Sequence, residues 1–473
     1  MAKPVKTYAC SACGAVFPKW AGRCEACGAW NTLEEQVARS ALPGGIKDTA
    51  RRAGVKIEFV GLEGISPPPP RTPSTISEFD RVLGGGLVPA SVVLVGGDPG
   101  IGKSTLLLQV SAALGRSGQE VVYISGEESV DQIRMRALRL GLSDAPLHLA
   151  AATQLGDILA SLPHFPNAAL VVIDSIQTMW TEGVDSAPGS VTQVRAAAFE
   201  LIRAAKTQGF SLLLVGHVTK EGALAGPRVL EHMVDVVLHF EGDRGHQFRI
   251  LRGVKNRFGA TDEIGVFEMT GQGLSEVANP SALFLAERRG NVAGSAVLAG
   301  LEGSRPVLVE IQCLLAPNPG GSPRRSVIGW DSGRLSMLLA VLETRCGLKL
   351  AMNDVYLNVA GGLRVNEPAA DLAVAAALIS AACDVPTDPS MVFFGEIGLS
   401  GELRQVAQTE LRLKEAAKLG FSHAGGPKRI AGGTGRLNIP KTLIMSEIGH
   451  LTDLVGLVTT GKKPATKQSK ERE

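Results

Sequence analysis

The feature that constrains this chain most is the stretch Ser91-Val-Val-Leu-Val-Gly-Gly-Asp-Pro-Gly-Ile-Gly-Lys-Ser-Thr105. It begins with a short apolar run typical of a buried strand, continues through a glycine-rich turn, and leads at Lys103 into an apolar helical stretch, 106–114. This order of strand, loop and helix around a Gly-x4-Gly-Lys-Ser pattern is typical of a phosphate-binding loop. The alternative is a plain glycine turn, which the lysine and serine at this spacing disfavour.

The residue types in this loop suit the binding of a nucleotide. Glycines let consecutive backbone N–H groups turn toward a phosphate, and the N-terminus of the next helix adds a partial positive charge. Lys103 can reach the β- and γ-phosphates, and the Ser104 hydroxyl can bind Mg²⁺. The residues expected to hold the nucleotide are Gly97, Asp98, Pro99, Gly100, Ile101, Gly102, Lys103, Ser104 and Thr105.

Length and composition limit the classes of protein to be considered. A chain of 473 residues is too long for one ordinary core, and 45% hydrophobic with 20% charged residues is typical of soluble globular proteins. The net charge of +2 gives no argument for a polyanionic partner, so any nucleic-acid surface must be local. We find no signal-peptide pattern and no apolar run long enough to span a bilayer. A cytoplasmic protein without a membrane partner is expected.

A cluster of cysteines near the N-terminus predicts a metal site. Two Cys-x2-Cys-Gly repeats are formed by Cys10, Cys13, Cys24 and Cys27. Four thiolates suit tetrahedral Zn²⁺ with no open position for catalysis, and the metal would supply the folding energy of so short a segment. A redox dithiol or an iron centre is the alternative, which the repeat disfavours. Trp20 and Trp30 are expected to cover this module, 1–33; the alternative is that they are exposed and stack on nucleic-acid bases.

The middle of the chain predicts an α/β domain. A polar segment with a run of prolines, 34–73, is expected to be a linker, and a core over 74–280 follows. Strands are predicted at 91–95, 120–125, 169–173, 211–215 and 234–240, and helices at 130–140 and 191–207. Such alternation is typical of a mostly parallel sheet covered by helices.

Two of these strands end in carboxylates. Asp174 ends the apolar run Ala169-Leu-Val-Val-Ile-Asp174, as in a Walker B segment, and is expected to hold the water shell of Mg²⁺ opposite Ser104. The strand at 120–125 is followed by Glu127 and Glu128, one of which could deprotonate the attacking water. Acidic residues also favour the first turn of a helix, so a solvated helix start is the alternative.

The order of these elements resembles RecA-type ATPases. In that family the general base follows the strand after the phosphate-loop helix, which implies Glu127, and a basic pair from a neighbouring subunit completes the site. Lys255 and Arg257, in Lys255-Asn-Arg-Phe-Gly259, match that pair, and the plain alternative is a solvated strand edge. The pentapeptide, the cysteine repeats and the phosphate loop together resemble the RadA (Sms) family of bacterial DNA recombination and repair ATPases.

That resemblance implies ligands, assembly and activity. The implied cofactors are ATP, Mg²⁺ and Zn²⁺, and the implied assembly is a hexameric ring. The implied partners are single-stranded and branched DNA and a RecA-type recombinase. Lys220 and Arg228 are candidate DNA contacts, although each is a lone surface charge on the plain interpretation. The implied activity is ATP-dependent translocation on single-stranded DNA, which promotes branch migration of recombination intermediates.

The C-terminal third, 281–458, has an α+β pattern and resembles Lon peptidases. The serine nucleophile that Lon carries after a proline is replaced here by Ala369, and the Lon lysine corresponds to Glu410 or, one turn later, to Lys414. A methyl group cannot attack a carbonyl, so an ATP-dependent peptidase is disfavoured. We expect the fold to be kept as a scaffold for ring assembly and DNA binding. Five cations could form a basic surface on it, and a set of separately solvated charges is the alternative: Arg305, Arg324, Arg325, Arg345 and Lys349. The tail, 459–473, is expected to be disordered and basic. A nucleotide-switched scaffold that hydrolyses ATP slowly is the alternative function.

Overall fold

The computed structural model describes residues 7–10, 16–17, 19–25, 28–30, 33–36, 70–216, 229–242, 247–261, 263–286, 288–318, 320–428 and 438–460. The chain forms two compact units, Met1–Pro67 and Pro68–Glu473. In the first unit, three short antiparallel strands form a sheet in the order β2-β1-β3. They are β1 (Thr7–Cys10), β2 (Val16–Phe17) and β3 (Leu33–Gln36). Trp20 and Trp30 are 57% and 70% exposed, so the expectation that they cover this module is wrong.

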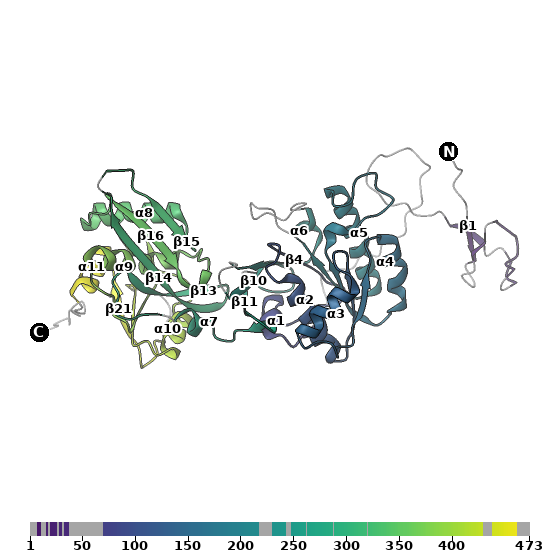
Figure 1. The fold of residues 1–473 in the computed structure, drawn as a ribbon, viewed down its shortest axis with the longest axis horizontal. Helices are drawn as coiled ribbons and strands as arrows, with labels where there is room; N and C mark the ends of the chain where they lie inside the picture. The colour runs from purple at the N-terminus through teal and green to yellow at the C-terminus, as the bar shows by residue number, and fades with distance from the viewer. Residues whose placement is uncertain are drawn as a thin grey trace, which may run out of the picture. The chain divides into compact units, whose positions relative to one another are not determined.

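The second unit begins with a nine-stranded sheet in the order β12-β11-β10-β9-β4-β8-β7-β5-β6. Figure 1 labels β4, β10 and β11 of this sheet, with α1, α2 and α3 beside them. The six strands from β9 to β6 in this order are parallel, and β10, β11 and β12 extend the sheet antiparallel. The strands are β4 (Val92–Gly97), β5 (Glu120–Ser125), β6 (His148–Ala151), β7 (Ala168–Asp174), β8 (Ser211–Val215), β9 (Val236–Glu241), β10 (Phe248–Asn256), β11 (Ile264–Thr270) and β12 (Gly273–Glu276). The predicted α/β core with a mostly parallel sheet is confirmed.

Helices cover both faces of this sheet, which explains why its central strands are continuously apolar. In β4, Val93 and Val95 face a core shared with α1, α2 and α3, whereas Val92 and Leu94 face a core shared with α4, α5 and α6. The helical elements are α1 (Ser77–Leu83), α2 (Lys103–Arg116), α3 (Val130–Arg139), α4 (Leu155–Ser161), η1 (Leu162–His164), η2 (Ile176–Thr178), α5 (Val191–Gln208) and α6 (Val229–Met233). The carboxyl ends of β4, β5 and β7 therefore meet at one edge.

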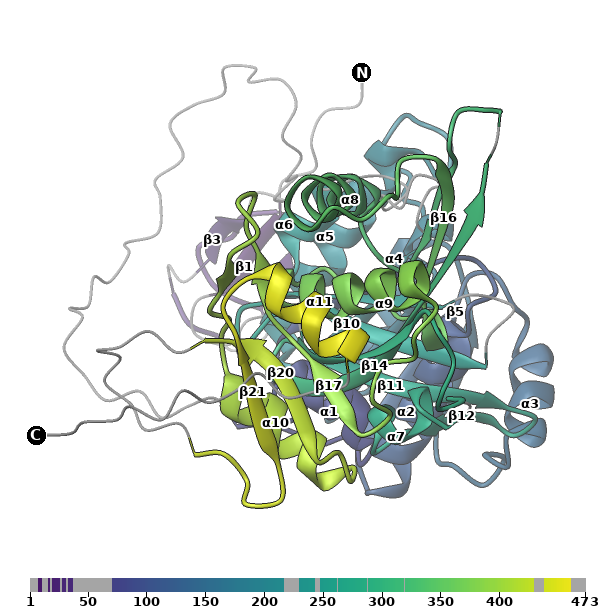
Figure 2. The ribbon, with the colours of Figure 1, turned by 90° about the vertical axis from the view of Figure 1, so that its left-hand side faces the viewer.

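A second, seven-stranded mixed sheet has the order β15-β16-β14-β13-β17-β20-β21 (Figure 2). Its strands are β13 (Ser295–Glu302), β14 (Arg305–Pro317), β15 (Arg325–Ile328), β16 (Asn353–Val359), β17 (Met391–Phe393), β20 (His423–Pro427) and β21 (Ile444–Ile448), and β18 (Glu396–Ile397) pairs with β19 (Leu403–Arg404). The helical elements are α7 (Pro280–Phe284), α8 (Ser332–Cys346), η3 (Ala360–Gly362), η4 (Pro368–Ala370), α9 (Asp371–Cys383), α10 (Thr409–Lys418) and α11 (Leu451–Thr460).

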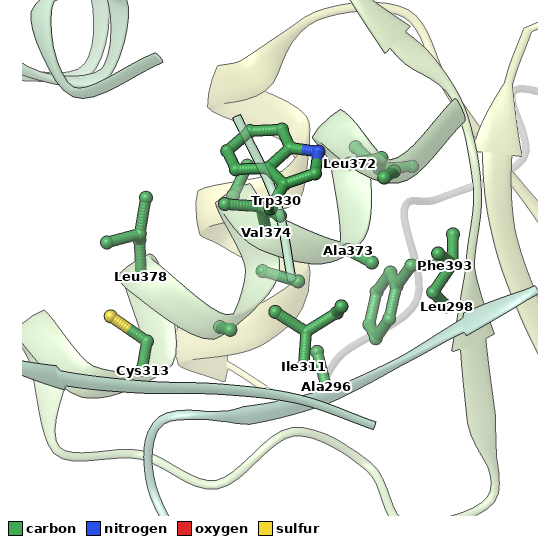
Figure 3. Packing of buried hydrophobic residues seen from close by; sticks show 14 of the residues in the cluster. Ala296, Leu298, Ile311, Cys313, Trp330, Leu372, Ala373, Val374, Leu378 and Phe393 are labelled. Atoms are coloured by element: carbon green, nitrogen blue, oxygen red, sulfur yellow. The ribbon is translucent and has the colours of Figure 1, made fainter. Parts of the chain in front are cut away.

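The core of this second sheet is organised around α9. The helix is apolar nearly all round because it packs on β13 and β14 and also contacts α8 and α11. Figure 3 shows Val374 and Leu378 of α9 above Ile311 and Cys313 of β14. Its alanines let the helix lie close to the strands, so the alanine-rich run reflects tight packing.

Buried ion pairs connect the segment before residue 280 to the sheet that follows it. Arg305 of β14 pairs with Glu78 of α1, and both side chains are almost fully buried. Arg252 of β10 pairs with Glu302 of β13. Arg305 therefore does not belong to an exposed basic surface, and that part of the sequence expectation is wrong.

Candidate nucleotide site

The phosphate loop connects β4 to α2 in a conformation that requires glycine. At Gly97, φ is +155°, and an added Cβ would lie 2.4 Å from the Phe240 carbonyl oxygen. At Gly102, φ is +113°, and a Cβ would lie 2.8 Å from Met269 Cε. No side chain fits at either position without displacing its neighbours, so the backbone itself forms the surface of the loop.

Lys103 lies inside this loop. Its side chain is almost completely buried, and Nζ donates to the carbonyl oxygens of Gly97 at 2.7 Å and Asp98 at 2.9 Å. Burial lowers the pKa of Lys103, and the carboxylates of Asp174, Glu127 and Asp98 oppose this shift. A buried ammonium at the start of a helix, enclosed by a glycine loop, fits the phosphates of a nucleotide.

Asp174 is held at the end of β7 by a neighbouring strand. The Tyr123 hydroxyl of β5 donates to Asp174 Oδ2 at 2.6 Å, and both residues are buried. Burial raises the pKa of Tyr123 well above its usual value, and the Asp174 carboxylate adds to this shift, so the phenol stays a hydrogen-bond donor. This bond fixes one carboxylate oxygen of Asp174.

The two glutamates after β5 have different surroundings. Glu128 forms an ion pair with Arg136 of α3, which neutralises its charge. Glu127 is exposed, and Oε1 accepts a hydrogen bond from the Ser175 hydroxyl just beyond β7. Its carboxylate also acts on the pKa of Lys103, which places its charge beside the phosphate loop. Of the two, Glu127 is the more exposed to water, and its charge is the one that acts on Lys103 of the phosphate loop.

Lys255 and Arg257 lie at the other end of the same sheet. Gly97 pairs with Phe240 of β9, whereas Lys255 pairs with Val237, and β4 and β9 run parallel. The phosphate loop is at the carboxyl end of these strands, and the two cations are at the amino end. The structure thus brings Lys103, Glu127 and Asp174 together and leaves the basic pair apart from them.

Sequence reasoning missed one basic residue beside the loop. Arg249 of β10 is buried, and its Nε donates to the carbonyl oxygen of Ile101 at 3.2 Å. The contact bridges residues that are far apart in sequence, and no local pattern marks it. The one feature of the sequence that could have indicated this contact is an arginine within an otherwise apolar stretch of a strand, at a position whose side chain faces the core.

The N-terminal cysteine module is described in part. Cys10 ends β1, and Cys24 is buried in a tight turn in which the Gly28 N–H donates to the Cys24 carbonyl oxygen at 2.8 Å. Cys13 and Cys27 lie outside the described residues, as do Lys220, Arg228 and the tail after Thr460. Within the part of the chain that the structure describes, no group of three metal-binding side chains occurs.

In the C-terminal sheet, the position expected for a nucleophile is closed. Ala369 is buried in η4, and its carbonyl oxygen accepts from the Gly395 N–H at 2.8 Å. Glu410 Oε1 accepts from the Asn438 N–H at 2.9 Å, and Glu410 Oε2 lies 3.9 Å from Lys414 Nζ. Ala369, Glu410 and Lys414 therefore offer neither a hydroxyl nor a thiol nucleophile.

A glycine loop around a buried lysine, with Asp174 and Glu127 at the same edge of a parallel sheet, defines a P-loop ATPase with a RecA-type core. Residues 71–223 match the family described as AAA domain, 8–35 match the rubredoxin metal binding domain, and 336–429 match subunit ChlI of Mg-chelatase. The predicted arrangement of a zinc-ribbon module, an ATPase core and a Lon-like domain is confirmed as a fold class. No helix among the described residues has the length and apolar character needed to cross a membrane.

Comparison with curated proteins gives the family. The DNA repair protein RadA of Brucella abortus (strain 2308) is 54% identical over 98% of this chain and 100% of its own length. The DNA repair protein RadA of Rickettsia felis (strain ATCC VR-1525 / URRWXCal2) is 50% identical over 97% of this chain and 100% of its own. The Bacillus subtilis (strain 168) RadA is 51% identical over 89% of this chain and 92% of its own. This chain belongs to the RadA family of DNA repair proteins, as the sequence motifs predicted.

Proposed function

We propose that this chain is a DNA-stimulated ATPase that moves along single-stranded DNA and promotes branch migration of recombination intermediates. Membership of the RadA family of DNA repair proteins supports the action on DNA. The observation that supports an ATPase built from several subunits is the separation of two groups on one sheet. The nucleotide-binding residues lie at its carboxyl edge, and the basic pair Lys255 and Arg257 lies at its amino edge. A basic pair in this position can complete the site of a neighbouring copy, as expected in a ring.

Each residue of the site has a proposed role. The loop from Gly97 to Thr105 would hold the phosphates, and Lys103 would contact the transferred group. Ser104 and Asp174 would hold Mg²⁺, which neutralises phosphate charge when it is bound. Glu127 would accept the proton of the attacking water.

The basic pair would act across the subunit interface. The positive charges of Lys255 and Arg257, supplied by one subunit, would stabilise the charge that develops on the phosphates bound by the next. The assembly proposed is a hexameric ring.

The N-terminal module would bind Zn²⁺ through Cys10, Cys13, Cys24 and Cys27. This proposal is supported by the tight turn at Cys24 and by the match to a metal binding domain. The module would contact DNA or a RecA-type recombinase, which suits a protein of the bacterial cytoplasm.

Steady-state ATP hydrolysis, measured with and without single-stranded DNA, tests the motor. Lys103→Ala serves as the blank because it removes the cation of the phosphate loop. Strong stimulation by DNA supports the proposal, and branch migration of a synthetic junction is then measured. A rate that DNA leaves unchanged rejects the translocase.

A mixing experiment tests the shared site. A Lys103→Ala subunit keeps its basic pair, and an Arg257→Ala subunit keeps its phosphate loop. If the site lies between subunits, mixed rings of the two inactive variants regain hydrolysis at interfaces that combine the intact halves. If each subunit works alone, the mixture stays as inactive as its parts.

A further inference from the structure

Asp235 lies at the amino edge of the sheet, between α6 and β9, and is almost fully buried. Oδ1 accepts from Arg257 Nη1 at 3.2 Å, and Oδ2 accepts from Lys206 Nζ at 2.7 Å and from the Val92 N–H at 3.1 Å. Burial alone would raise the pKa of this carboxyl, but the donors hold it below its usual value, so the group is charged. Its negative charge is therefore available to Arg257.

The backbone next to Asp235 holds the second cation. Lys255 Nζ donates to the carbonyl oxygens of Glu231 at 2.6 Å and Val234 at 2.8 Å, at the C-terminal end of α6. Carbonyls at a helix C-terminus attract a cation. In addition, the Arg257 N–H donates to the Asp235 carbonyl oxygen at 3.1 Å. One short segment, 231–235, thus contacts both members of the basic pair.

These contacts restrict side chains that would otherwise sample many conformations. Arg257 is 56% exposed, and free arginine and lysine side chains each carry about 2 kcal/mol of rotamer entropy. A cation that must meet a phosphate on another subunit acts best when its position is fixed beforehand. The Asp235 carboxylate provides this, because it binds the guanidinium through Nη1 while the side chain stays accessible to a ligand.

We infer that Asp235 is a positioning residue of the ATPase site of the neighbouring subunit: it holds Arg257, and with it the Lys255 segment, in the orientation needed to contact the bound nucleotide. The inference rests on the proposed shared site. Asp235 would not touch the nucleotide and would act only through Arg257. Its loss should therefore lower the catalytic rate and leave nucleotide binding by its own phosphate loop intact.

Asp235→Asn tests this, because the amide keeps the shape and one acceptor oxygen but presents no charge to Arg257. We expect kcat to fall at least about 10-fold, while the Kd for fluorescent ADP stays within about 2-fold. In a random mixture with Lys103→Ala subunits, about one quarter of interfaces combine an intact loop with an intact basic pair. Hydrolysis should then rise clearly above the sum of the two separate variants.

Lys206→Met is the matched control. It removes the other cation from Asp235 and leaves the contact with Arg257, so its hydrolysis should stay within about 2-fold of the unmodified protein. If Asp235→Asn fails to bind ADP because it does not fold, Asp235→Glu enters the same mixtures. It keeps the charge but shifts it by one methylene, and the same loss and recovery are expected.

The outcomes separate this inference from the proposal on which it rests. Unchanged kcat in the Asp235 variants overturns the inference. The inference is also overturned if Lys103→Ala subunits restore hydrolysis to Arg257→Ala but not to the Asp235 variants. In that case the shared site still stands. If Arg257→Ala is not restored either, the shared site is rejected and the role of Asp235 with it.

Discussion

Replacing Arg305 by methionine removes the cation from the buried ion pair between α1 and β14. The guanidinium contacts Glu78, and it also donates to the carbonyl oxygens of Ala278 at 3.0 Å and Val277 at 3.3 Å. Removing one partner of a buried pair leaves the other charge poorly compensated, which costs about 3–5 kcal/mol. Glu78 keeps the more distant, half-exposed Arg81, whose Nε lies 3.9 Å from Oε1, so we expect the lower end of this range. Methionine fills most of the space, so we expect the loss to come from the stranded Glu78 carboxylate rather than from a cavity.

Urea unfolding followed by circular dichroism measures this loss. The double variant Glu78→Gln with Arg305→Met leaves no unpaired charge at this position. In the unmodified protein the Val266 N–H donates to Glu78 at 2.8 Å, and the amide oxygen of the substituted side chain can still accept this hydrogen bond. The double variant should therefore lose less than the sum of the single ones. Arg203→Met breaks the exposed pair with Glu200 and should cost less than about 1 kcal/mol. If Arg305→Met lowers the free energy of unfolding no more than this control does, the buried pair does not stabilise the contact between α1 and β14.

Three further predictions concern Glu127, the N-terminal module and Asp235. Glu127→Gln should lower the rate constant of hydrolysis, measured in a single-turnover assay, by about 100-fold or more and keep ATP binding. A nucleotide switch with the same substitution would instead retain its DNA-linked function. Chelation of zinc should unfold the N-terminal module and leave the nucleotide affinity of the rest unchanged; a metal assay that finds no zinc would contradict this. Because the pKa of Asp235 is lowered in the folded state, its stabilising effect is full above its unfolded value near 3.8 and is lost as pH falls through the lower folded value. The stability difference between the unmodified protein and Asp235→Asn should therefore narrow in acid, and a difference independent of pH would refute the charged role.

Local patterns predicted the ATPase core well. The phosphate loop, the strand that ends at Asp174 and the alternation of strands and helices each depend on residues close in sequence. In a parallel sheet covered on both faces, such runs are distinctive. The structure adds a distinction between Glu127 and Glu128 that the sequence left open. Glu127 accepts a hydrogen bond from Ser175, whereas Glu128 forms an ion pair with Arg136.

Long-range pairing accounts for what the sequence did not predict. Arg305 was expected on a basic surface, but its partner Glu78 is more than two hundred residues away. The contact of Arg249 with the phosphate loop has the same origin. A charged residue carries no local mark that separates a buried pair from a solvated one, because its partner comes from another element.

The strand β10 carries three functions along one segment. Arg249 reaches the phosphate loop, Arg252 reaches Glu302 of the next sheet, and Lys255 reaches the end of α6. A change of side chain affects one of these contacts, whereas a change in the number of residues between them affects every contact that follows, since each insertion or deletion turns the following side chains to the opposite face. The strand already contains one irregularity in its pairing with β9, between Gly253 and Lys255. Arg252 pairs with His239, and Lys255 pairs with Val237. Arg252 and Lys255 therefore lie on the same face of the sheet although they are three residues apart. Within this family, β10 should thus tolerate substitution far better than any change in length.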